Sequence, residues 1–411
     1  MELKRVVVTG LGAVTPVGNT PEETWNNMVN GVSGAAPITL FDASKFKTHF
    51  ACEVKGLNVN DYIDRKEARK MDRYTQLAFI SAIQAVNDSG MDLDATDKDR
   101  VGVIFGVGIG GIKTFEDEVG YYGAHKEDGP KFNPFFIPKM IADIAAGQIS
   151  IHFGFHGPNY ATTSACASST NALADAFNQL RLGKADVILA GGAEAAICAC
   201  GVGGFNAMHA LSTRNDDPEH ASRPFSASRD GFIMGEGAGC LILEELEHAK
   251  ARGAKIYAEM VGEGESADAY HITASHPEGL GAKLVMERAL QDAGLKPEDI
   301  DYINVHGTST PVGDVSEAKA IKQVFGDAAY KLNISSTKSM TGHLLGAAGG
   351  IEAVATALTV ENDMMPPTIN YETPDEGLDL DYVPNKARAK KVRAAISNNF
   401  GFGGHNACIV M

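Results

Sequence analysis

The sequence of 411 residues lacks features that mark several large classes of protein. It has no apolar run suited to a membrane helix, because its most apolar window, 187–205, contains Glu194 and is broken by glycine pairs. Basic residues are also few: 36 lysines and arginines stand against 52 acidic residues, which gives a net charge of −16. This charge opposes binding to nucleic acid and to anionic membrane surfaces, so we expect neither as a partner.

Cysteines are scarce and do not form CxxC pairs. The six lie at positions 52, 166, 198, 200, 240 and 408. The first residues offer only Val6–Val8 where an export signal needs a long apolar stretch, so we expect reduced thiols and a cytoplasmic protein. No metal or nucleotide site is expected. His152 and His156 have no third ligand pattern, and the segment 10–14 lacks the third glycine of a dinucleotide fingerprint.

Glycine is abundant, with 45 residues in short clusters, which predicts many close backbone contacts. Short β-branched runs ending in glycine alternate with alanine-rich stretches of helical spacing, a pattern typical of α/β layers. No linker of low complexity divides the chain, and we predict two similar halves, 1–255 and 256–411. The irregular regions 108–135 and 205–235 are expected to cover a site or contact a partner. The predicted strands cover 5–10, 100–106, 186–192, 302–307 and 394–404, and the predicted helices 72–89, 165–182 and 281–293.

Cys166 lies in the small-residue segment 162–170, where a strand-like stretch runs into a helix. A thiol at a helix N-terminus gains a lowered pKa from the helix dipole and the free N–H groups, and small neighbours leave room for a substrate. The position therefore predicts a nucleophile. A buried structural thiol is the alternative, and we assign that role to the other five cysteines.

Two further segments carry histidines beside polar residues. His306 comes directly after the run 302–305 and precedes glycine and hydroxyl residues, so it should face a cleft. Lys338 and His343 lie in the polar loop 335–343, which leads into a helix beginning near residue 344. Each histidine alone could be an ordinary core or surface residue, but their joint occurrence with a candidate nucleophile favours a catalytic role.

A fourth segment, 398–406, surrounds Phe402 with glycines. These glycines leave the backbone N–H of Phe402 free to face a developing oxyanion and allow its ring to swing. A plain hairpin turn is the alternative.

In this order, the four segments resemble the β-ketoacyl-acyl-carrier-protein synthases, specifically the type II elongating enzymes, and the likeness spans essentially the whole chain. This family implies a thiolase-like fold, with two similar halves in a five-layered α-β-α-β-α arrangement, usually as a homodimer. His209 stands where relatives often carry arginine, and Asn399 and His405 where some carry serine and threonine. Further matching segments are 202–205, 210–215, 221–225, 229–232 and 235–239.

The resemblance implies a decarboxylative condensation. An acyl group would pass from acyl carrier protein to Cys166, and malonyl-carrier protein would lose carbon dioxide to give the carbanion that attacks this thioester. His306 and His343 would stabilise the enolate as neutral donors, and the N–H groups of Cys166 and Phe402 would hold the oxyanion. The chain elongated in this way is a fatty acid.

The family also implies supporting residues. Lys338 would order the polar cluster, with Glu352 as its charge partner, because a buried ammonium needs pairing. Thr308 and Thr310 would bind the phosphopantetheine arm. That arm arrives on the carrier protein, so no resident cofactor is expected.

Substrate pocket and docking surface are implied in the same way. Ile109, Phe136 and Phe205 match acyl-pocket positions, with Phe136 entering from the neighbouring subunit, although all three could simply be core residues. A basic stripe at helical spacing, on a protein of negative charge, is expected to dock the acidic carrier protein, with Lys131 assisting. The stripe consists of Arg65, Lys66, Arg69 and Lys70.

Two rival classes share this fold. A thiolase would use a second catalytic cysteine and only one of these histidines, and a chain-length-determining partner of a ketosynthase would lack the nucleophile. The set of Cys166, His306 and His343 disfavours both. The acyl-chain length, and a polyketide or specialised lipid role, stay open at this point.

Overall fold

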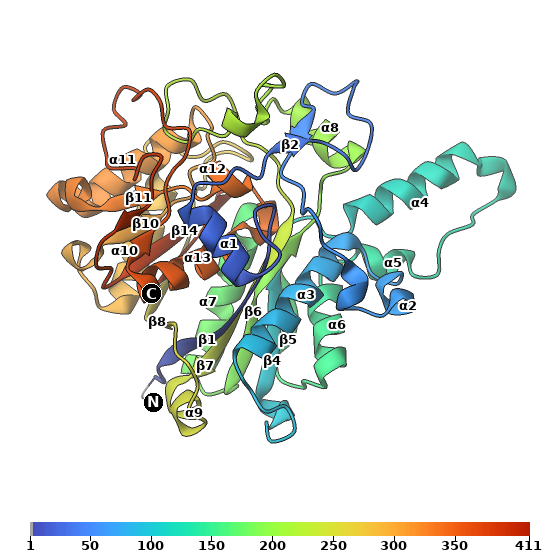
Figure 1. Cartoon of the computed structure of the whole chain (residues 1–411), viewed down its shortest axis with the longest axis horizontal. Coiled ribbons are helices and arrows are strands. Elements are labelled where there is room, and N and C mark those ends of the chain that lie inside the picture. Colours follow the sequence, from blue (N-terminus) through green and yellow to red (C-terminus); the bar gives the residue numbers. More distant parts are fainter. Residues whose placement is uncertain (1–2) are drawn as a thin grey trace.

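Two β-sheets organise residues 3–411, the part of the chain that the computed structural model describes (Figure 1). The six-stranded sheet has the order β5-β4-β6-β7-β1-β8 and the five-stranded sheet the order β11-β10-β14-β15-β9. The strands of the first are β1 (Val6–Val14), β4 (Val101–Gly106), β5 (Asn159–Thr162), β6 (Val187–Glu194), β7 (Gly237–Glu245) and β8 (Ala258–Met260). Those of the second are β9 (Gly262–Ala267), β10 (Tyr302–Asn304), β11 (Asn333–Ser335), β14 (Ala395–Gly401) and β15 (His405–Val410).

Helices α7 (Ser168–Arg181) and α13 (Ala348–Asn362) fill the layer between the sheets. Their small side chains permit this: a Cβ on Gly349 of α13 would lie 2.1 Å from the Thr170 hydroxyl of α7. Outer helices cover the other faces, with α3 (Arg73–Asp88) and α6 (Ile144–Phe153) on the first sheet. On the second sheet, α10 (Leu280–Ala293) packs against β9 and β15, and α11 (Gly313–Phe325) packs against α10. The predicted five-layered α/β fold is confirmed.

Parallel pairing brings the catalytic segments to one place. β4 runs parallel to β5 and β6, and β10 runs parallel to β11 and β14. The segments with Cys166, His306, His343 and Phe402 each follow the carboxyl end of one of these strands, namely β5, β10, β11 and β14. Loops at the carboxyl ends of parallel strands commonly form binding sites in α/β proteins.

The predicted helices and strands are present, but several begin or end at different residues. The helix expected over 165–182 begins as a 3₁₀ turn, Ala165–Ala167, before α7. The helix expected near residue 344 begins at Ala348, because a second 3₁₀ turn, Leu345–Ala347, precedes it. The sequence did not predict five strands of the two main sheets, β7, β8, β9, β11 and β15. Other elements are α1 (Pro21–Val29), β2 (Ala36–Pro37), β3 (Phe50–Ala51), α2 (Arg65–Ala68), α4 (Ile112–Ala124), α5 (Phe136–Met140), α8 (Ala199–Ala207), α9 (Leu246–Ala251), α12 (Lys338–Thr341), β12 (Met364–Met365) and β13 (Arg388–Ala389).

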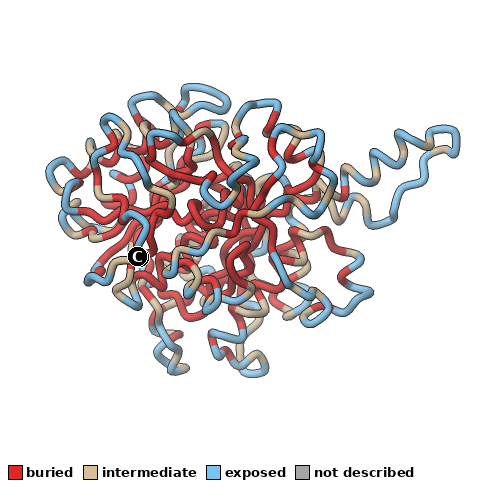
Figure 2. Tube along the Cα trace, turned by 45° about the horizontal axis from the view of Figure 1, so that its top comes forward, coloured by how far each residue is buried: buried red, intermediate tan, exposed pale blue. Residues whose placement is uncertain are grey.

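An arm formed by α4, the following loop and α5 (residues 112–140) projects away from the layers (Figures 1 and 2). It is mostly exposed, yet it carries large apolar side chains: Phe115, Val119, Tyr121, Phe132, Phe135 and Ile137 are all among the exposed hydrophobic residues. An exposed apolar surface of this kind usually marks a contact with another protein. Within residues 3–411, no helix is long and apolar enough to cross a membrane.

Candidate active site

Cys166 lies at the turn between β5 and α7, and its side chain is almost completely buried. The preceding residue, Ala165, has φ of 51°, a left-handed conformation that is strained for a residue with a Cβ. The Ser168 hydroxyl stabilises the turn by accepting the Ser164 N–H and donating to the Ala165 carbonyl oxygen. Gly401 leaves the space for this turn, because a Cβ there would lie 3.0 Å from the Cys166 nitrogen.

The pKa of the Cys166 thiol differs from the prediction. Burial raises it to about 12 and outweighs the Lys338 charge and the Phe402 N–H, which both lower it. The prediction of a lowered pKa considered the helix end alone and left out desolvation, which here is the larger effect. The thiol is therefore protonated at neutral pH.

His343 is the closest partner of this thiol, with its Nε2 atom 3.0 Å from Sγ. The Leu345 N–H donates to the other ring nitrogen, Nδ1, at 3.3 Å. Burial and the Lys338 charge hold the pKa of His343 well below its usual range, so the ring is neutral. Because Nδ1 accepts a hydrogen bond, the single ring proton lies on Nε2 and points toward Sγ.

His306 stands beside His343, with ring centroids 5.3 Å apart and ring planes nearly perpendicular. Its pKa is also held well below the usual range, first by burial and then by the charge on Lys338 and by His343. Glu317, which the sequence analysis did not single out, fixes the backbone here. Its carboxylate accepts the N–H groups of His306 and Gly307 at 2.9 and 2.8 Å.

Lys338 lies beneath the histidines and is buried. Its Nζ is 2.5 Å from Oε1 of Glu352, the partner expected from the resemblance. Asn399 donates to the second oxygen of Glu352 at 2.7 Å and accepts from the Thr170 hydroxyl. The ammonium is therefore paired, and its positive charge lowers the pKa of Cys166 and of both histidines.

A cavity of about 350 Å³ opens onto these groups. The Thr308 and Thr310 hydroxyls lie 3.1 Å apart in its wall, and the Phe402 ring faces that of Phe205 at 6.4 Å. Seven of the predicted site residues line the cavity: Cys166, Phe205, His306, Thr308, Thr310, His343 and Phe402.

Ile109 and Phe136 do not line this cavity in the single chain. Ile109 is 42% exposed on the loop after β4, and Phe136 stacks on Phe132 of the arm with centroids 5.4 Å apart. Ile109 precedes the arm and Phe136 packs within it, and neither side chain reaches the cavity in one chain.

The basic residues differ from the predicted helical stripe. α2 ends at Ala68, so Arg69 caps it and Lys70 lies beyond it. Lys70 is partly covered and pairs with Glu67 at 2.7 Å, and Lys131 on the arm lies 3.8 Å from Asp128. Arg65, Lys66 and Arg69 remain exposed around one short turn.

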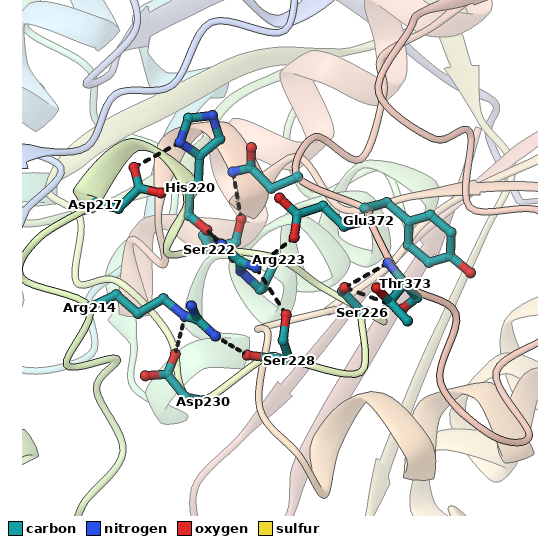
Figure 3. A network of polar contacts seen from close by, with 12 residues as sticks. Arg214, Asp217, His220, Ser222, Arg223, Ser226, Ser228, Asp230, Glu372 and Thr373 are labelled. Atoms are coloured by element: carbon teal, nitrogen blue, oxygen red, sulfur yellow. Dashed lines mark hydrogen bonds and ion pairs between the residues drawn. The ribbon is translucent and has the colours of Figure 1, made fainter.

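Beside the cavity entrance lies a polar network that includes residues of the segments 221–225 and 229–232 (Figure 3). The buried Arg223 donates to Glu372 at 3.0 Å and to the Ser228 hydroxyl at 2.9 Å. Arg214 donates to the Ser228 carbonyl oxygen and lies 3.7 Å from Asp230, which lines the cavity. The network fixes this side of the entrance. An arginine inside an otherwise small and apolar motif was the available sequence signal.

Comparisons with known proteins agree over the whole chain. Residues 3–249 match the family model "Beta-ketoacyl synthase, N-terminal domain", and residues 257–372 match "Beta-ketoacyl synthase, C-terminal domain". The 3-oxoacyl-[acyl-carrier-protein] synthase 2 of Staphylococcus aureus (strain COL) is 53% identical over 411 residues, covering 99% of this chain and 98% of that protein.

Solved structures agree as well. The ishigamide ketosynthase/chain length factor superposes with a TM-score of 0.93 at 34% identity, covering 99% of this chain and 98% of that one. A type II PKS acyl-carrier protein in complex with its ketosynthase bound to the hexaketide gives a TM-score of 0.89 at 36% identity, covering 100% and 99%.

Proposed function

The chain belongs to the β-ketoacyl synthase family, and on that premise we propose how its own residues carry out the reaction. The resemblance inferred from the sequence is confirmed. The chain is a condensing enzyme of the acyltransferase class that joins an acyl-enzyme thioester to malonyl-acyl carrier protein and lengthens a fatty acid by two carbons.

Cys166 accepts the acyl group first. Its protonated sulfur loses the proton as it attacks the carrier-protein thioester, and the carrier thiol leaves with a proton, so the number of thiols and thioesters is unchanged. The N–H groups of Cys166 and Phe402 stabilise the tetrahedral oxyanion. Enclosure excludes water from the thioester.

Malonyl-carrier protein enters next, and its carboxylate leaves as carbon dioxide. The electron pair of the broken bond forms an enolate, whose oxygen accepts hydrogen bonds from the neutral rings of His306 and His343. The enolate carbon then attacks the Cys166 thioester, and the sulfur leaves as a thiolate that takes up one proton from water to restore the thiol. The two neutral rings with lowered pKa values, one of them 3.0 Å from the sulfur, are the observation that carries this proposal.

The proposal also covers the binding partners of the chain and its cellular compartment. The carrier protein brings the phosphopantetheine arm, so no resident cofactor takes part, and Thr308 and Thr310 bind that arm. We propose that two copies of the chain pair through the apolar arm, residues 112–140, so that Phe136 of each copy reaches the other's acyl pocket. The setting is the cytoplasm, which is consistent with the six free thiols.

A thiolase-type reaction is disfavoured, because Cys166 is the only cysteine among the described residues that line the cavity. The test is a mass spectrum of the protein after incubation with acyl carrier proteins bearing chains of different lengths, followed by addition of malonyl-carrier protein. Acylation confined to the peptide containing Cys166, and its discharge as a 3-oxoacyl product with release of carbon dioxide, is the expected result. Acylation elsewhere would contradict the proposal.

A further inference from the structure

Glu194 is a buried carboxylate that the mechanism does not use. It ends β6, directly beside the site, and within residues 3–411 no basic side chain pairs with it. Four backbone N–H groups surround it instead. Oε2 accepts from Gly108 at 2.9 Å and from Gly346 at 3.1 Å, Oε1 accepts from Gly110 at 3.1 Å, and Ile109 donates to both oxygens.

These donors come from two separate segments. Gly108 to Gly110 form the loop after β4 that carries Ile109, and Gly346 belongs to the turn that follows His343. In that turn, Leu345 has φ of 50° and donates to the His343 ring. One carboxylate therefore holds the loop of the expected acyl pocket against the turn that orients a catalytic histidine.

The packing leaves no room for a different arrangement. A Cβ on Gly346 would lie 2.1 Å from the Gly108 nitrogen and 2.7 Å from Oε2 of Glu194. A Cβ on Gly108 would lie 2.5 Å from the same oxygen. The Gly346 carbonyl oxygen also accepts from the Ser169 hydroxyl, on the helix that Cys166 precedes. Hydrogen bonds and close packing thus link the carboxylate, both loops and the nucleophile's helix.

We propose that Glu194 is a positioning residue with two effects. It fixes the Gly108–Gly110 loop, which sets the range of acyl-chain lengths, and through Gly346 it fixes the orientation of His343. The proposal rests on the proposed condensing function. Burial raises the pKa of Glu194 to about 7, and the four backbone N–H groups oppose that shift. Those N–H groups favour the ionised form, whose two oxygens only accept hydrogen bonds.

Glu194→Gln tests this directly. The glutamine amide places its own N–H groups against backbone N–H donors, so the hydrogen bonds accepted by at least one side-chain oxygen are lost while the size of the side chain is kept. We expect the ratio of Cys166 acylation rates with sixteen-carbon and eight-carbon carrier thioesters to change by about fivefold or more, since the loop no longer holds a fixed pocket wall. We also expect condensation to slow with little change in the Michaelis constant for malonyl-carrier protein.

Glu244→Gln is the matched control. Glu244 is a buried carboxylate on β7 and lies opposite Val187, the first residue of β6. Glu194 is the last residue of β6, seven residues further along the strand, so the two carboxylates are roughly 23 Å apart. Its replacement should leave the length ratio unchanged. A merely destabilising variant scales the rates for both chain lengths equally, because the unfolded fraction is inactive toward either, so the ratio distinguishes positioning from folding.

The outcomes separate the two proposals. If the unaltered protein is not acylated at Cys166, the proposed function fails. If it is acylated and Glu194→Gln keeps the same length ratio, the role of Glu194 is overturned. Should Glu194→Gln not fold, Gly346→Ala decides, because its methyl group forces the same two loops apart: a changed ratio supports the proposal, and an unchanged one overturns it.

Discussion

The catalytic cluster is buried, whereas the arm is exposed to solvent. Cys166, His343, Lys338 and Glu352 are buried, with the His343 ring 3.0 Å from the Cys166 sulfur and Lys338 paired with Glu352. The arm, residues 112–140, exposes a row of aromatic and aliphatic side chains to solvent. These residues therefore form a buried cluster, whereas the arm leaves its apolar side chains uncovered.

Enclosure also determines the protonation states. Burial raises the pKa of the Cys166 thiol, and burial together with the Lys338 charge lowers the pKa of both histidines. Near the arm and α2 the charges are closer to solvent: Lys70 is partly covered and pairs with Glu67 at 2.7 Å, whereas Arg65, Lys66 and Arg69 are exposed. Exposed pairs contribute little energy, so changes there should tune binding and leave the chemistry intact.

Removal of the nucleophile should have the largest effect. Cys166→Ala removes the one thiol found among the described residues that line the cavity, so acylation and condensation should fall by roughly 10⁴-fold or more while the fold is kept. Intact-protein mass spectrometry with acyl-carrier protein measures the acylation. Cys408→Ala, in the core of the second sheet, is the control and should still be acylated. A Cys166→Ala protein that still forms a thioester would disprove the assignment.

The histidine variants should act on the second half-reaction. His306→Ala or His343→Ala removes one hydrogen-bond donor to the enolate, which should slow malonyl decarboxylation by about 10²–10³-fold while some acylation remains. Release of labelled carbon dioxide from malonyl-carrier protein gives the rate. His156→Ala, on an exposed surface loop, serves as the control. Normal release by both site variants would show that their role is wrong.

The pH dependence follows from the same groups. The neutral imidazole is the active donor, and a lowered pKa keeps a histidine neutral at every pH above that value. With both pKa values well below the usual 6.5, the decarboxylation rate should show no step near pH 6.5 and should fall only in more acidic solution. A rate that doubles or halves around pH 6.5 would indicate that a histidine titrates there.

Pocket volume should have a smaller effect. Ile109→Phe adds bulk to the loop after β4, and overpacking costs about 1–3 kcal/mol, or roughly tenfold against the longest acyl chains. Acylation with six- to sixteen-carbon thioesters, on the protein in its native oligomeric state, gives the length profile. Phe205→Leu, on the cavity wall itself, should shift the profile the opposite way. If Ile109→Phe leaves the profile unchanged, Ile109 does not line the pocket in the assembled protein.

The sequence predicted the parts of the site that depend on local pattern. A strand-like stretch before small residues located Cys166, and a strand end before glycine and hydroxyl residues located His306. A polar loop before a helix located His343. Each of these patterns lies within a few neighbouring residues and is therefore visible in the sequence. Glu194 could not be found in this way, since its four N–H partners lie 84 to 86 and 152 residues away in sequence. The predicted direction of the Cys166 pKa shift was wrong for a related reason. Desolvation of the thiol depends on all the segments that enclose it, and these are far apart in the sequence.

Substitutions on the docking surface should have the smallest effects, and the size of the effect should differ between Lys66 and Lys70. Lys66 is exposed and free of a described ion pair, whereas Lys70 is partly covered and already neutralised by Glu67. Lys66→Glu should therefore raise the Michaelis constant for carrier-bound substrate severalfold, and Lys70→Glu by less, because an exposed charge contributes about 0.2–1 kcal/mol. The effect should shrink as salt is added, since screening weakens attraction to an acidic carrier protein. A small pantetheine thioester, which has no acidic surface, should react with both variants at the unaltered rate; equal losses with both substrates would place these lysines in folding and not in docking.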